Sequence, residues 1–132
     1  MPRQVTHRTT DSKRLEAKTR IIEILRTVPH DQGFHFYTGL GYFTGETATS
    51  LDDFSKKLQV VAADSVIFHF QRSDFQKWIE DTIGDKTLAE RISFVELPFS
   101  VEELRKELQA MVKTRIAELK RTLPHSLRHI HS

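Results

Sequence analysis

The sequence predicts one mostly helical α+β domain, with a small antiparallel β-hairpin packed on a helical core and long helices at both ends. Three observations lead to this prediction. Apolar residues recur at spacings of three and four over most of the chain, which is the period of an amphipathic helix. One short aromatic stretch, residues 34–44, instead alternates and is broken by glycines. The chain has 132 residues, the length of a single domain.

The N-terminal region is expected to contain a helix over residues 11–28. Residues 1–10 are polar, and we expect them to form a disordered basic tail. Asp11 or Ser12 can cap the helix, and Pro29 ends it because proline cannot donate a backbone hydrogen bond. The apolar stripe of this helix consists of Leu15, Ile21, Ile22, Ile24, Leu25 and Val28.

The hairpin is expected to begin with a strand over residues 34–38. Gly39 and Gly41 mark a tight turn, residues 42–44 form the returning strand, and Gly45 closes the hairpin. Because a lone hairpin is only marginally stable, the face bearing Phe34 and Phe36 should pack on the helices.

The middle of the chain begins with a strong helix signal. Ser50 and Asp53 resemble a capping box, and an apolar series of Leu51, Phe54, Leu58 and Val61 follows. Residues 64–70 fit two interpretations, a short helix capped by Asp64 or a buried strand, because the run is short and contains β-branched residues.

Two further helices are expected after residue 72. Ser73 and Gln76 have the spacing of a second capping box, and Gly84 should terminate this helix. Asp85 should cap the next helix. The inward positions of the two helices are Phe75, Trp78, Ile79, Ile83, Leu88, Ala89, Ile92 and Val95.

The longest predicted helix covers residues 100–123, from the capping box of Ser100 and Glu103 to the stop at Pro124. Its length, roughly 35 Å at 1.5 Å per residue, is large for so small a core, so the N-terminal helix or a second copy should cover it. Residues 124–132 hold three histidines and should form a flexible tail. The apolar positions are Val101, Leu104, Leu108, Met111, Val112, Ile116, Leu119 and Leu123.

The charge is distributed unevenly along the chain. Residues 1–32 carry a net charge of +3, residues 33–99 carry −4 and residues 100–132 carry +3. An acidic middle is therefore flanked by two basic ends. Solvated helix faces are the default explanation of these charges. An anionic partner touched by both ends is the more specific one, and a contact between the basic ends of one subunit and the acidic middle of another is a third. The chain has no cysteine, which excludes disulfides and thiolate metal sites. No apolar run reaches the about 20 residues of a membrane span, and we expect a cytoplasmic protein.

Candidate catalytic groups are few. His69 and Asp74 could form a pair that orients a base, but no nucleophile motif accompanies them, so a structural role for His69 is favoured. His35 and His69 supply two metal ligands without a third. The glycines match neither a Walker loop nor a dinucleotide fingerprint. The sequence thus predicts no cofactor and no metal.

Residues 34–95 contain a recognisable series of motifs. FHFYTG is followed by TGETATSLDDF, then SVIFHFQRSDFQKWI and finally GDKTLA. This series resembles a family of small, mainly archaeal and bacterial proteins, the domain of unknown function 5752. The resemblance rests most on the combination of Phe68, His69, Arg72, Asp74, Phe75, Trp78, Gly84 and Asp85. It implies a prokaryotic, cytoplasmic origin and supplies no catalytic residue.

We therefore expect a non-enzymatic binding protein whose basic terminal helices contact RNA, DNA or a ribonucleoprotein such as the ribosome. One alternative is a protein–protein adaptor or homodimeric scaffold that uses Leu108, Val112, Ile116 and Leu119 of the last helix. A less favoured alternative is an enzyme built on His35, His69 and Asp74. The expected nucleic-acid contacts are Arg14, Lys18, Arg20, Lys113, Arg115, Lys120 and Arg121.

Overall fold

The computed structural model describes residues 2–124, with side chains from residue 12 onward. The predicted fold class is confirmed, because helices dominate and the two strands form one antiparallel sheet. The elements are α1 (Pro2–Leu25), the 3₁₀ turn η1 (His30–Gln32), β1 (Phe34–Tyr37), β2 (Phe43–Ala48), α2 (Leu51–Val60), α3 (Ala63–Gln71), α4 (Asp74–Trp78), the π-helical turn η2 (Ile79–Ile83), α5 (Lys86–Ser93) and α6 (Val101–Arg121).

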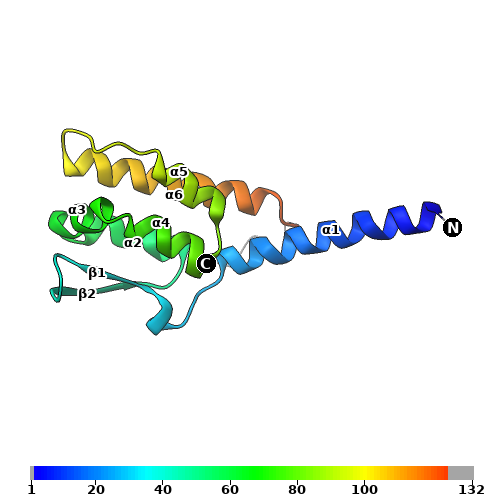
Figure 1. Ribbon diagram of the computed structural model, residues 1–132, viewed down its shortest axis with the longest axis horizontal. Helices are drawn as coiled ribbons and strands as arrows, with labels where there is room; N and C mark the ends of the chain where they lie inside the picture. Colours follow the sequence, from blue (N-terminus) through cyan, green and yellow to red (C-terminus); the bar gives the residue numbers. More distant parts are fainter. Residues whose placement is uncertain (1, 125–132) are drawn as a thin grey trace.

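Figure 1 shows three layers in the body of the molecule. Helices α5 and α6 form one outer layer, α2, α3 and α4 lie in the middle, and the hairpin forms the other outer layer. Helix α2 contacts α6 on one side and β2 on the other, while β1 contacts α3. Helix α1 contacts this body only near its C-terminal end and then projects away from it.

The start of α1 differs from the prediction. The helix begins at Pro2 rather than near Asp11 or Ser12, so residues 2–10 belong to it. Proline is well tolerated in the first helical turn, and no glycine or further proline interrupts the segment that follows. Ile24 and Leu25 are buried as expected, but Leu15 and Ile22 are exposed because the helix leaves the body there.

The hairpin also differs from the prediction in its second strand. This strand begins at Phe43, one residue after the expected start, and continues through Gly45 to Ala48. Phe34 pairs with Ala48 and Tyr37 with Phe43, with a register shift between His35 and Tyr37. Between the pairs His35–Thr47 and Tyr37–Phe43, β2 holds three residues and β1 holds one, so the irregularity adds two residues to β2. One of the three is Gly45, whose positive φ of 90° glycine tolerates. Gly45 therefore lies inside the strand instead of closing the hairpin.

Residues 64–70 are helical and form most of α3, which excludes the buried strand. Asp64 is not the cap of this helix, since Ala62 occupies that position and makes no side-chain hydrogen bond. The capping box of Ser73 and Gln76 is also absent. Ser73 adopts a left-handed conformation, its side chain accepts no capping hydrogen bond, and the Oε1 of Gln76 has no partner.

Three predicted helix caps are confirmed. The side chain of Ser50 accepts a hydrogen bond from Asp53 N–H at 3.0 Å, that of Asp85 from Leu88 N–H at 3.3 Å, and that of Ser100 from Glu103 N–H at 3.1 Å. Gly84 terminates η2 with a φ of 92°, as its sequence position indicates.

Aromatic rings at the centre of the core join the hairpin to the middle layer. The Phe34 ring lies 4.8 Å from Phe36, 5.7 Å from Phe54, 5.2 Å from Phe75 and 5.7 Å from Trp78, measured between centroids. The indole N–H of Trp78 donates to the carbonyl of Gln32 at 3.0 Å, which fixes η1 to α4. The expected inward residues of α4, η2 and α5 are buried. They are Phe75, Trp78, Ile79, Ile83, Leu88, Ala89 and Ile92.

The apolar stripe of α6 packs inside the chain's own core. Leu108 and Val112 have no exposed surface, and Ile116 and Leu119 are also buried. The prediction that these four residues contact a partner is therefore wrong, because α2, α3 and α5 already cover them. Among the described residues, no helix combines the length and the apolar character that crossing a membrane requires.

Candidate functional site

His69 is buried where α3 meets the hairpin, and both of its ring nitrogens are hydrogen-bonded. The backbone N–H of Tyr37 donates to Nε2 at 2.8 Å. Nε2 must therefore be an acceptor, so the proton resides on Nδ1 and is donated to Asp74 Oδ2 at 2.8 Å. Burial lowers the pKa of His69 and outweighs the hydrogen bond to Asp74, which acts in the opposite direction. His69 is thus a neutral imidazole with one fixed tautomer.

Arg72 completes the cluster from the other side of Asp74. Its Nε–H donates to the same Oδ2 atom at 3.0 Å, and its guanidinium carbon lies 5.0 Å from the centre of the Phe68 ring. The terminal nitrogens of Arg72 make no hydrogen bond or ion pair with another described residue. The half-exposed guanidinium of Arg72 therefore keeps terminal N–H donors that are not bonded to any described residue.

Ser73 connects Arg72 to Asp74 in an unusual conformation. Its φ of 62° makes it the one non-glycine residue with positive φ among the described residues. This backbone region is unfavourable for a residue with a Cβ atom. The left-handed turn separates α3 from α4 at the point where Arg72 and Asp74 converge on one carboxylate oxygen.

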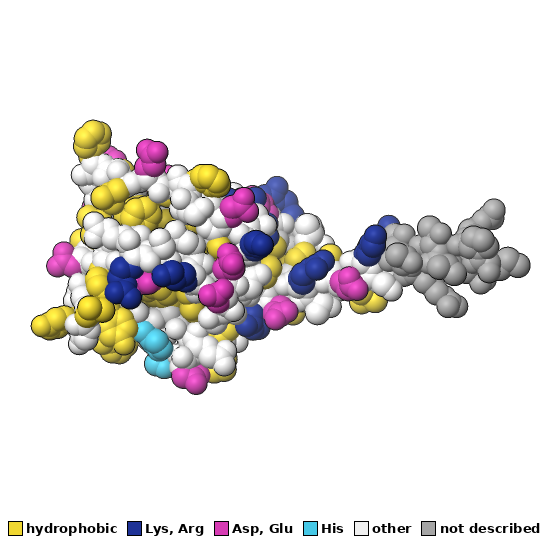
Figure 2. Space-filling model, in the orientation of Figure 1, with side chains coloured by type: hydrophobic (Ala, Val, Ile, Leu, Met, Phe, Trp, Pro, Cys, Tyr) yellow, Lys and Arg dark blue, Asp and Glu magenta, His cyan; other side chains and the backbone are white. Residues whose placement is uncertain are grey.

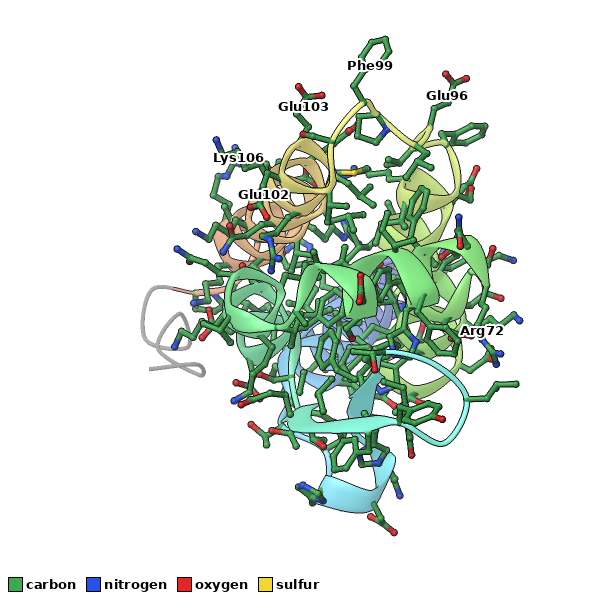
Figure 3. The ribbon with its side chains drawn as sticks, turned by 90° about the vertical axis from the view of Figure 1, so that its left-hand side faces the viewer. Arg72, Glu96, Phe99, Glu102, Glu103 and Lys106 are labelled. Atoms are coloured by element: carbon green, nitrogen blue, oxygen red, sulfur yellow. The ribbon has the colours of Figure 1, made fainter. Side chains whose placement is uncertain are left out.

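A hollow of about 440 Å³ lies beside this cluster, between β1, the hairpin turn and the end of α3. Figure 3 shows Arg72 at the edge of the body, next to the hairpin turn. The lining is mainly apolar with a few convergent polar groups, which is typical of a small-molecule site. It consists of Gly33, Phe34, His35, Tyr37, Gly39, Leu40, Gly41, Phe68, His69, Arg72 and Asp74.

The structure brings together four of the residues singled out for a possible catalytic site or structural motif: His35, His69, Arg72 and Asp74 all line the hollow. Phe75 and Trp78 lie in the core behind it. Acid–base catalysis by His69 would require a free ring nitrogen, whereas Tyr37 and Asp74 occupy both. His35 is engaged by Thr47, with Nδ1 2.8 Å from the hydroxyl oxygen.

Arg115 is not available to a nucleic acid, in contrast to its predicted role. It pairs with Asp85 through two hydrogen bonds of 2.8 and 3.1 Å and with Glu118 at 3.2 Å. Burial works against the charge of Arg115, yet Asp85 and Glu118 outweigh it and hold the pKa above its ordinary value. A hydrogen bond from Arg91, aided by Arg115, lowers the pKa of Glu118. Arg115 therefore joins α6 to the start of α5.

The other predicted nucleic-acid contacts remain at the surface. Arg14, Lys18 and Arg20 on α1 are exposed, as are Lys113 and Arg121 on α6, while Lys120 is half-buried. A groove between the two helices is lined by Arg20 from α1, by Leu119 from α6 and by Thr122 directly after α6, so the basic end of α6 lies beside α1.

Sequence reasoning missed Lys106. It precedes Lys113 and Lys120 by seven and fourteen positions, so the three lysines form one stripe along α6. None of the three forms an ion pair with a described residue. The regular spacing of seven residues between these lysines was the signal that would have identified this stripe.

An exposed apolar loop joins α5 to α6. Phe94, Leu97 and Phe99 are exposed, and Figure 3 shows Phe99 pointing away from the body. This loop is therefore one apolar surface that is open to another molecule, whereas the stripe of α6 is buried.

The part of the chain that the structure describes contains no group of three or more His, Asp or Glu residues arranged to hold a metal. The histidines after residue 124 lie outside the described residues.

Comparisons with known proteins give one positive result. No curated protein and no solved structure matches the chain. A family model does match, over residues 7–113 and again over residues 71–129. The first match extends beyond the motifs at residues 34–95 and covers more than half of the chain. The chain therefore belongs to the family described as a family of unknown function (DUF5752).

Proposed function

We propose that the chain binds nucleic acid, free or within a ribonucleoprotein such as the ribosome, through phosphate contacts of α1 and α6. The observation that carries this proposal is the pairing of cations. In residues 33–99, four of the six cations, Lys56, Lys57, Arg72 and Arg91, pair with a carboxylate, whereas Lys77 and Lys86 form no ion pair with a described residue. On α1, none of Lys13, Arg14, Lys18 and Arg20 pairs with a described residue.

The geometry of α1 supports the proposal. Arg14, Lys18, Ile21 and Leu25 follow one another at spacings of four, three and four, so they share one helix face. The C-terminal half of this face packs on the body through Leu25, while its basic half lies on the projecting part. Figure 2 shows basic side chains on that part, with acidic ones among them. A projecting helix of this kind can lie along a nucleic-acid groove.

The lysine stripe of α6 adds a second set of charges. Lys106, Lys113 and Lys120 are roughly 10.5 Å apart along the helix axis, since each step covers seven residues. A lysine ammonium is a compact charge on a flexible side chain, so it can pair with a phosphate without a fixed geometry. Phosphate contacts position a protein without reading bases, so this function requires no sequence preference.

The experiment is a matched pair of triple variants. One variant carries Lys18→Gln, Lys113→Gln and Lys120→Gln, and the control carries Lys56→Gln, Lys57→Gln and Lys77→Gln. Both lose three positive charges, but only the first loses them from α1 and α6. Binding to labelled RNA and to duplex DNA is measured by fluorescence anisotropy over a range of salt concentrations, together with the melting temperature.

The first variant should lower the slope of log affinity against log salt by about 2 to 3, because each lost phosphate contact removes about 0.7 to 0.9. The control should keep the slope of the unmodified chain. Equal slopes in the two variants, or no binding of the unmodified chain even at low salt, would refute the proposal. The RNA and DNA titrations identify the preferred nucleic acid.

A further inference from the structure

We infer that the hollow beside Arg72 binds a small organic anion, with its acidic group on Arg72 and its apolar body in the hollow. This site is separate from the basic faces of α1 and α6. Its volume of about 440 Å³ lies within the range of small-molecule pockets.

Arg72 determines the charge of the ligand. A guanidinium has five N–H donors, and of those on Arg72 only the Nε–H is bonded to Asp74. The terminal donors are therefore left for a second acceptor. Such donors form a planar fork that matches a carboxylate or phosphate group through two parallel hydrogen bonds. The Phe68 ring beneath the guanidinium carbon restricts the orientation of that fork.

The remaining charges also favour a single anionic group. Asp74 is the one carboxylate that lines the hollow, and its charge is offset by Arg72. His69 is neutral and has no free nitrogen, so it adds neither a charge nor a donor. The cluster is therefore close to neutral, and an anion is held by the unused terminal N–H donors of half-exposed Arg72 rather than by a net positive charge.

The wall of the hollow indicates an apolar body. Phe34 and Phe68 provide aromatic surface, and Leu40 on the hairpin turn forms an exposed apolar rim. The backbone N–H groups of Gly39, Leu40 and Gly41 make no hydrogen bond with another described residue, so this turn offers further donors near the rim. A ligand with an aromatic ring and one terminal acidic group satisfies both parts of the site.

The cluster is also held in place before any ligand arrives. Asp74 fixes the Nε of Arg72, His69 fixes Asp74, and the Tyr37 N–H fixes His69. The unfavourable backbone of Ser73 lies at the centre of this chain of contacts. Strained backbone of this kind tends to occur at ligand sites, because the surrounding structure must hold it there.

The test uses three probes of similar shape, phenylacetate, phenyl phosphate and the neutral 2-phenylethanol. Saturation-transfer NMR detects binding, and titrations followed by protein amide shifts give the dissociation constants. At least one anionic probe should bind with a dissociation constant of about 1 mM or below, as expected for about ten heavy atoms, and at least fivefold more tightly than the alcohol. The chain with Arg72→Gln should lose that preference.

Two controls keep the result interpretable. Lys106→Gln removes one exposed cation far from the hollow and should leave the binding of the probes unchanged. Arg72→Lys keeps the charge but loses the planar fork, and should weaken the anionic probe at least threefold even if Arg72→Gln fails to fold. Equal binding of the anionic and neutral probes, unchanged binding in Arg72→Lys, or no binding of any probe would overturn the inference.

Discussion

His69 provides the sharpest test of the energetics of the hairpin junction. Replacing it with alanine removes the acceptor of the Tyr37 N–H and the donor to Asp74. It also removes a ring whose centroid lies 4.7 Å from that of Phe34 and 4.9 Å from that of Phe68. The loss therefore combines unsatisfied polar groups with a cavity in an aromatic cluster.

The magnitude follows from these contacts. A buried N–H left without a partner costs about 1 to 3 kcal/mol, and a lost hydrogen bond to a carboxylate costs about 1.5 kcal/mol or more. The lost packing of the ring adds about 1 to 2 kcal/mol. Asp74 keeps its hydrogen bond from Arg72, which limits its share. We expect His69→Ala to lower the free energy of unfolding by about 4 kcal/mol.

The pH dependence of stability is a second, independent signature of the same residue. Burial lowers the pKa of His69 below the 6.5 of an exposed imidazole. Above pH 6.5 the imidazole is neutral in both states and its contribution to stability is complete. Below pH 6.5 the unfolded chain binds a proton that the folded chain does not. As the pH is lowered from 6.5 toward the pKa of His69 in the folded chain, the free energy of unfolding therefore decreases, by at most about 1.4 kcal/mol per pH unit.

The assay is urea denaturation followed by the fluorescence of Trp78, the single tryptophan, between about pH 7.5 and 5. The titration of His69 is isolated by subtracting the values of His69→Gln from those of the unmodified chain. His30→Gln, which removes an exposed imidazole, is the control. A cost of His69→Ala below about 1 kcal/mol, or a difference from His69→Gln that does not shrink below pH 6.5, would refute the reasoning.

Three further predictions concern stability. Asp85→Ala should lower the free energy of unfolding by about 4 kcal/mol, because it removes the cap of α5 and leaves the charge of Arg115 without its main partner. Urea denaturation measures this loss, and a loss below about 1 kcal/mol would contradict the prediction. Ser73→Gly should raise the melting temperature, with a gain of about 1 kcal/mol from relief of the left-handed backbone, and a lower melting temperature would count against strain there. Val112→Lys should unfold the chain by placing a charge in the core. The circular dichroism spectrum of the variant measures this, and a spectrum typical of the folded chain would show that Val112 is not buried.

The elements of the fold were largely predictable from local patterns. Ser50, Asp85 and Ser100 mark helix starts because each side chain satisfies an N–H group only three residues away. The apolar period also predicted the inward residues of α6 correctly. The same apolar period was also consistent with a partner interface. The sequence pattern of an apolar helix stripe is the same whether its own chain or a partner covers it.

The local rules failed where the backbone geometry depends on distant contacts. Ser73 and Gln76 have capping-box spacing, but Ser73 takes a left-handed conformation where Asp74 reaches His69 and Arg72. Gly45 looks like a turn residue, yet it lies within a strand whose register shifts. In both cases tertiary contacts overrode the local preference.

The candidate sites show the same division. The basic character of both chain ends was evident from the sequence, but the identity of the unpaired cations was not. Arg115 pairs with Asp85, thirty positions away in sequence, whereas Lys106 forms no ion pair with a described residue. The hollow near Arg72 depends on contacts between β1, the hairpin turn and α3, which periodicity does not encode.

The sequence by itself determined the class of the fold, the helix caps at Ser50, Asp85 and Ser100, the buried face of α6 and the absence of thiol chemistry, because these depend on residue type and on spacings within a few turns. Only the tertiary structure decided that α1 projects from the body, that His69 is neutral with both nitrogens bonded, and which cations are paired. Those properties arise from groups that are distant in sequence, whose burial and partners exist only once the chain has folded.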